Sequence, residues 1–108
     1  MIEVREYVDA YGRTPYRDWF VTLDASVRAR IAASVLRLEF GNFSAAKGVG
    51  TGVFELRLDL GPGYRIYFGK VGSTIVLLLS GGDKGTQVKD IRQAQRYFAE
   101  YLEAIKDG

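Results

Sequence analysis

The stretch VFELRLDLGPGYRIYFGKVGSTIVLLLS, residues 53–80, decides the fold, because it contains three predicted strands joined by two short turns. Apolar and polar residues alternate through 53–60, a pattern typical of a strand with one buried face. The apolar face of this strand carries Phe54, Leu56, Leu58 and Leu60. The polar face carries Glu55, Arg57 and Asp59.

The second and third predicted strands differ from each other in pattern. Residues 64–71, YRIYFGKV, place Tyr64, Ile66 and Phe68 on one face and Arg65 and Tyr67 on the other. Residues 74–80, TIVLLLS, are nearly all apolar, which indicates a central strand. The turns GPG at 61–63 and VGS at 71–73 are too short for a crossover. The three strands should therefore form an antiparallel meander.

One further strand and three helices are predicted outside this segment. Residues 2–8 alternate and indicate a strand, whereas the glycine-rich residues 41–52 indicate a loop. Thr14 and Pro15 begin a short helix that runs through 16–23, and Asp24 opens a longer one over 25–40. The last helix should cover 86–107.

We therefore predict an α+β fold in one domain over residues 1–108. A small antiparallel sheet should carry an N-terminal helical hairpin on one face, and a C-terminal helix completes the chain. The hairpin should bury Phe54, Leu56 and Ile66. The opposite face of the sheet should then carry Glu55, Arg57, Arg65 and Tyr67.

Composition limits the chemistry that is available. The chain has no cysteine and no histidine, so acid–base chemistry must use Lys, Arg, Tyr, Asp or Glu. Between residues 47 and 96 eight basic residues face four acidic ones, a local excess that suits phosphate-bearing partners or is plain scatter. The N-terminus does not resemble a signal peptide and no apolar run could span a bilayer, so we expect a cytoplasmic protein without a membrane partner.

Arg57 and Arg65 are expected side by side on neighbouring strands, where two guanidinium groups repel each other unless an anion separates them. One interpretation is a clamp for phosphate. The other is that Glu55 and Asp59 neutralise both arginines. Because Arg65 is expected outside the core, Arg65→Ala should leave the fold intact. Tyr67 on the same face either stacks on a base or reflects strand preference.

The loop LSGGDKGTQ, residues 79–87, also suggests phosphate handling. It lacks the spacing of a Walker A loop, so it is not predicted to bind a free nucleotide. Thr86 is a candidate helix cap, and the amides of the next turn could hold a phosphate oxygen. Lys84 is either a ligand for that phosphate or a solvated loop charge.

Residues 52–94, GVFELRLDLGPGYRIYFGKVGSTIVLLLSGGDKGTQVKDIRQA, closely resemble the RelE/ParE toxin superfamily, in its HigB-like, phage-derived addiction module killer branch. The segments ELR, GPGYRIYF and GGDKGTQVKDI carry the resemblance at these spacings. The order of elements is also similar over nearly the whole chain.

The resemblance implies a RelE-like fold and the toxin of a type II toxin–antitoxin system. Its activity would be metal-independent cleavage of mRNA on the ribosome, with no cofactor. In that reaction the 2′-hydroxyl of the RNA attacks the adjacent phosphate. The partners would be mRNA, the ribosome and a cognate antitoxin, in this branch typically a helix-turn-helix protein.

The resemblance also implies site residues. Arg65 falls on the arginine of GYR as a ligand of the transition-state phosphate, and Arg57 on the basic position of the preceding strand. Lys84 is the candidate base or acid, and Asp90 is a further acid–base candidate. RNA contacts are expected from Lys47, Tyr67 and Lys89.

Two other functions remain open at this point. A ParE-like gyrase inhibitor would act by binding without catalysis, and an inactive remnant would only bind its antitoxin. A pure binder has no need for a cluster of Arg57, Arg65 and Lys84, which favours the ribonuclease.

Overall fold

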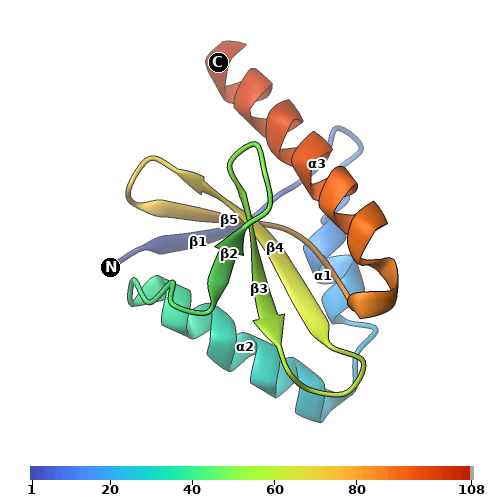
Figure 1. Cartoon of the computed structure of the whole chain (residues 1–108). Coiled ribbons are helices and arrows are strands. Elements are labelled where there is room, and N and C mark those ends of the chain that lie inside the picture. The colour runs from blue at the N-terminus through green and yellow to red at the C-terminus, as the bar shows by residue number, and fades with distance from the viewer. Residues whose placement is uncertain (108) are drawn as a thin grey trace.

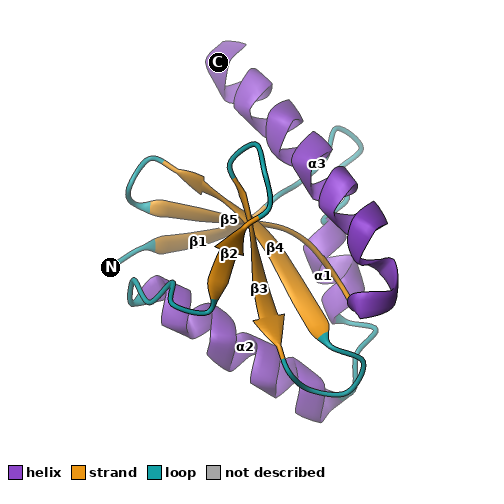
Figure 2. Ribbon diagram, viewed as in Figure 1, coloured by secondary structure: helices purple, strands orange, loops and turns teal. Residues whose placement is uncertain are grey.

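A computed structural model describes residues 1–107 and contains five strands and three α-helices among them. The strands are β1 (Glu3–Glu6), β2 (Ala46–Gly48), β3 (Val53–Leu58), β4 (Tyr64–Val71) and β5 (Ile75–Gly82). The helices are α1 (Pro15–Phe20), α2 (Ala25–Glu39) and α3 (Gln87–Asp107), and a 3₁₀ turn, η1 (Lys84–Thr86), precedes α3. The predicted α+β class is confirmed (Figure 2).

The five strands form one sheet in the order β1-β5-β4-β3-β2. The meander predicted from residues 53–80 is present: β3 pairs antiparallel with β4, and β4 antiparallel with β5. Leu56 lies opposite Ile66, and Arg57 lies opposite Arg65. The first strand adds a feature that was not predicted, because β1 joins the edge of β5 in parallel. A short strand, β2, also forms inside the predicted glycine-rich loop.

A first core lies between the sheet and the helical hairpin of α1 and α2. Phe54, Leu56 and Ile66 of the sheet pack there, as predicted, against Ile31 and Leu38 of α2. Ile31 and Leu38 are completely buried. Apolar residues at this helical spacing explain why α2 forms and where it packs, since tertiary burial of one face stabilises a helix of this length.

A second core lies on the opposite face of the sheet, beneath α3 (Figure 1). Ala94 and Phe98 of α3 pack there against Leu77 and Leu79. Because β5 is covered on both faces, its nearly continuous apolar sequence is the pattern of a central strand. The face predicted to be open and polar is therefore covered along much of its length.

The C-terminal part of α3 continues beyond the sheet (Figure 1). Leu102 and Ile105 are 40% and 48% exposed, respectively. The apolar face of α3 is thus used for packing mainly up to Phe98. No helix among residues 1–107 is both long and apolar enough to cross a bilayer.

Gly69 allows α3 to approach the sheet. A Cβ at Gly69 of β4 would collide with the Phe98 ring, whereas a Cβ at Gly48 would meet only ordinary contacts. Gly69→Ala should therefore displace Phe98 and lower the free energy of unfolding by about 1–3 kcal/mol. Urea unfolding measures this, with Gly48→Ala as the strand-glycine control. An equal loss of unfolding free energy in the two variants would contradict the close contact between Phe98 of α3 and Gly69.

Candidate functional site

Arg57 and Arg65 are direct cross-strand partners on the same face of the sheet, as predicted. Their environments differ strongly. The side chain of Arg57 is 56% exposed and lies 3.5 Å from a carboxylate oxygen of Asp59. Arg65 is only 4% exposed. Arg57 therefore lies at the protein surface, whereas Arg65, opposite it on the neighbouring strand, is buried.

Arg65 is fixed by a buried ion pair. Its Nε donates to a carboxylate oxygen of Glu55 at 3.3 Å, and its Nη1 donates to the Gly63 carbonyl at 2.7 Å. The other oxygen of Glu55 accepts from the Gln87 side chain of α3 at 2.9 Å. Three elements, β3, β4 and α3, are thus connected by one carboxylate. Sequence reasoning considered the Glu55 pairing but missed Gln87, whose only signal is its position one helical turn before Ile91, a half-buried residue packed against the second core.

Burial of Arg65 corrects one expectation. Arg65→Ala was expected to leave the fold intact, but it would leave the carboxylate of Glu55 buried without its cation. Removing one member of a buried pair is strongly destabilising, because the remaining charge cannot be solvated.

The loop after β5 does not offer a cradle of free amides. The N–H groups of Lys84, Gly85 and Thr86 donate to the Pro62 carbonyl, the Asp83 side chain and the Asp83 carbonyl, respectively. Asp83, and not Thr86, is the residue that caps η1. The N–H of Gln87, the first after Thr86, donates to the Lys84 carbonyl. The expectation that amides of the turn after Thr86 hold a phosphate oxygen stays a prediction.

The two glycines of this loop are explained by packing. A Cβ at Gly81 would collide with the Trp19 ring of α1 on one face of the sheet. A Cβ at Gly82 would collide with the Asp90 carboxylate of α3 on the other face. Helices from both layers therefore approach the end of β5 closely, and the glycines allow it.

Lys84 nevertheless lies at the predicted site. A Cβ on Gly63 would lie 3.1 Å from Nη1 of Arg65 and 3.6 Å from Cβ of Lys84. Lys84 is exposed. Gly63 of the turn between β3 and β4 therefore lies beside both Arg65 and Lys84, and Arg57 is opposite Arg65 in the strand register. Arg57, Arg65 and Lys84 are called the cationic cluster below. Arg57 also lines a cavity with Arg30 and Arg37 of α2.

Tyr67 does not lie on an open surface. It is fully buried beneath α3, which corrects the prediction that its ring could stack on an RNA base. Its hydroxyl and that of the neighbouring Ser80 find no hydrogen-bond partner among residues 1–107. Burial, and next the Glu55 and Asp90 carboxylates, raise the pKa of Tyr67. The phenol is therefore held in its neutral form.

The remaining predicted site residues lie around this region. Lys47 is exposed on β2 and is the cross-strand partner of Glu55. Lys89 is exposed on α3. The Asp90 carboxylate accepts a hydrogen bond from Thr86 Oγ1, which holds it at the start of α3. Within the described part of the chain, no three acidic side chains gather as metal ligands would.

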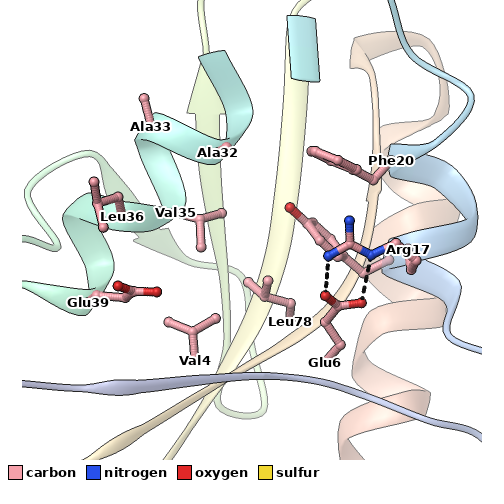
Figure 3. Close-up of a pocket in the computed structure, with 11 residues that line it drawn as sticks. Val4, Glu6, Arg17, Phe20, Ala32, Ala33, Val35, Leu36, Glu39 and Leu78 are labelled. Atoms are coloured by element: carbon pink, nitrogen blue, oxygen red, sulfur yellow. Dashed lines mark hydrogen bonds and ion pairs between the residues drawn. The ribbon is translucent and has the colours of Figure 1, made fainter. Parts of the chain in front are cut away.

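A separate groove lies on the hairpin side of the molecule (Figure 3). Apolar side chains of β1, β5 and the two helices line it, among them Val4, Phe20 and Leu36. Arg17 of α1 and Glu6 of β1 form an ion pair within it. None of the predicted site residues lines this groove.

Arg65→Ala should lower the free energy of unfolding by about 3–5 kcal/mol, because Glu55 would remain buried and uncompensated. Arg57→Ala is the control, since its exposed pair with Asp59 should change stability by no more than about 1 kcal/mol. Urea unfolding at neutral pH compares the two. A loss below about 1 kcal/mol for Arg65→Ala would show that the pair is not buried in solution.

Tyr67→Phe tests the unpaired hydroxyl. At neutral pH the substitution should raise the free energy of unfolding by about 1 kcal/mol, because it removes a buried hydroxyl that has no hydrogen-bond partner among residues 1–107. An unfolded tyrosine ionises near pH 10, whereas folded Tyr67 keeps its proton to higher pH. Wild type is therefore fully stabilised by this group below about pH 10 and loses that contribution as the pH rises further.

The Tyr67→Phe variant should accordingly lose less stability than wild type when the pH is raised above about 10. Unfolding monitored by circular dichroism across this range measures the difference. A marked loss of stability at neutral pH would instead mean that the hydroxyl has a partner.

Comparison with known proteins gives one relative and no matching family model. The chain is 53% identical over 68 residues to an uncharacterized protein of Haemophilus influenzae. The match covers 63% of this chain and 69% of the relative.

Proposed function

The chain belongs to the same family as this Haemophilus influenzae protein, and we propose that it is the toxin of a type II toxin–antitoxin system. Its activity is metal-independent endonucleolytic cleavage of mRNA on the ribosome. The observation that carries the proposal is the cationic cluster of Arg57, Arg65 and Lys84 around the 61–63 turn. The resemblance of residues 52–94 to RelE/ParE toxins, in their HigB-like branch, supports the same function.

The cluster suits a phosphate that gains charge during reaction. The 2′-oxygen of the RNA forms a bond to the adjacent phosphorus, and the bond from phosphorus to the 5′-oxygen breaks. The products are a 2′,3′-cyclic phosphate and a 5′-hydroxyl end. Cations that the fold already holds in position stabilise the extra negative charge of the transition state. An arginine can also donate two parallel hydrogen bonds to two phosphate oxygens.

Arg65 is positioned for this role by its buried partners. Glu55 and the Gly63 carbonyl accept from two of the five guanidinium N–H donors. The other donors have no acceptor among residues 1–107, so they remain for a phosphate oxygen. A rigid guanidinium loses little conformational entropy when it binds, whereas the exposed Arg57 and Lys84 must be ordered by the RNA.

Proton transfer requires a base for the 2′-hydroxyl and an acid for the 5′-oxygen. We assign these roles to Lys84 and Asp90, which lie on either side of Thr86 in the chain. Lysine and aspartate side chains can exchange a proton with a reacting oxygen that the substrate places within hydrogen-bond distance. Tyr67 has no role in proton transfer in this proposal, because it is buried.

The proposed partners follow from the same function. Lys47 and Lys89, both exposed, would contact RNA phosphates beside the cluster. A helix-turn-helix antitoxin would neutralise the toxin, and both would act in the cytoplasm. No cofactor enters the reaction.

Arg57→Ala and Lys84→Ala test the proposal without disturbing the core, because both side chains are exposed. Each should reduce mRNA cleavage roughly 100-fold or more, as expected when a charge-stabilising donor is lost. Primer extension on a reporter mRNA in a translating extract measures cleavage, and growth after induction without antitoxin measures toxicity.

Arg5→Ala is the matched control. Arg5 is also an exposed strand arginine, and it forms an ion pair with Glu3 two residues away, as Arg57 does with Asp59. Its loss should leave cleavage unchanged. Wild-type cleavage by folded Arg57→Ala would contradict the proposed site, and gyrase inhibition without mRNA cleavage would support the ParE-like alternative. Normal growth on induction would instead indicate an inactive antitoxin-binding remnant.

A further inference from the structure

We propose that the solvent-facing side of the first half of α3 binds the phosphate backbone of RNA. The surface consists of Lys89, Arg92 and Arg96 and is called the basic stripe below. The inference rests on the proposed function for the identity of the polyanion, and it extends the RNA-binding surface beyond the cationic cluster.

The three cations of the basic stripe lie on one side of the helix. At 3.6 residues per turn they fall within an arc of about 60°, on the side opposite the buried Ala94 and Phe98. All three side chains are exposed. Together with Gln93 they line a shallow depression of about 320 Å³. The sequence therefore presents three guanidinium or ammonium groups to one ligand.

Among residues 1–107, no acidic side chain forms an ion pair with the basic stripe. Elsewhere among residues 1–107 five arginines form ion pairs with Asp or Glu, but Lys89, Arg92 and Arg96 form none. At one end of the stripe Arg96 lines a surface cavity with Asp9, Asp18 and Glu100, but it forms no ion pair with them. Glu100 lies four residues after Arg96. Its carboxylate accepts from the Tyr7 hydroxyl at 3.1 Å.

The charges of the basic stripe are unfavourable within α3 itself. Arg92 and Arg96 are four residues apart on one helix, where like charges repel. Lys89 lies near the N-terminus of α3, whose dipole favours anions and disfavours cations. The charges therefore oppose folding slightly, and an anionic ligand would relieve that repulsion.

An RNA backbone fits the stripe better than a protein does. The stripe is about 10 Å long from Lys89 to Arg96, long enough to contact successive phosphates of one strand. Its three members are all cations, whereas the centre of a protein interface is depleted of charge. It also begins three residues after η1, so it continues directly from Lys84 in the cationic cluster.

The test compares two variants that each remove two positive charges. Arg92 and Arg96 are replaced in R92Q/R96Q, and the exposed Lys70 of β4 and Lys106 of α3, which form no ion pair among residues 1–107, are replaced in the control K70Q/K106Q. The probe is a 2′-O-methylated oligoribonucleotide, which lacks the attacking hydroxyl and cannot be cleaved. Its affinity is measured by fluorescence anisotropy as a function of salt.

Two lost phosphate contacts should lower the magnitude of the slope of log K against log salt by about 1.4, at roughly 0.7 per contact for a single strand. The control should keep the wild-type slope. Equal changes in both variants, or no change in R92Q/R96Q, would overturn the inference. Binding of polyglutamate in place of RNA, lost in R92Q/R96Q, would assign the stripe to an acidic protein and also overturn it.

This binding assay is independent of catalysis. If wild type binds the probe with the expected slope but cleaves no mRNA, the ribonuclease proposal fails while the RNA-binding stripe stands. If wild type cleaves mRNA and R92Q/R96Q binds the probe with an unchanged slope, the stripe fails while the ribonuclease proposal stands.

Discussion

The buried contact between Glu55 and Arg65 is the interaction on which the arrangement of this molecule depends. It joins β3 to β4 inside the sheet, and Gln87 extends it to α3. A carboxylate and a guanidinium at 4% side-chain exposure are stable only because each neutralises the other. The same pair fixes Arg65 beside the surface and, through Gln87, positions the start of α3, whose packing over the sheet also depends on Ala94 and Phe98.

The contact with Glu55 also fixes the position of Arg65 in the cationic cluster. Arg57 is exposed opposite Arg65, and the 61–63 turn brings Lys84 to the same end of the sheet. One cation is held rigidly by the core and two are free to adjust, an arrangement suited to a phosphate whose charge increases during reaction. The basic stripe of α3 extends this positive surface away from the cluster. Glu55, which stabilises the fold, and Arg57, which is proposed to bind phosphate, thus lie two residues apart on β3.

Local sequence pattern predicted the sheet well, because strand alternation between residues 53 and 71 places Leu56 and Ile66 on one face whatever covers them. It also predicted that Arg57 and Arg65 share a face. It did not predict that α3 buries most of that face, since Glu55, Arg65 and Tyr67 are polar residues typical of a solvated surface. Their burial depends on an ion pair formed between strands and on a helix distant in sequence.

The central claim is that the Arg57 and Arg65 end of the sheet binds the RNA phosphate. Nuclear magnetic resonance of the arginine Nε–H groups during titration with a non-cleavable oligoribonucleotide tests it most directly, because the buried Arg65 Nε–H is protected from exchange by Glu55. The account predicts saturable shifts of Arg57 and Arg65, with Arg17 of the hairpin groove unaffected. Shifts confined to Arg17, or none at saturating RNA, would contradict it.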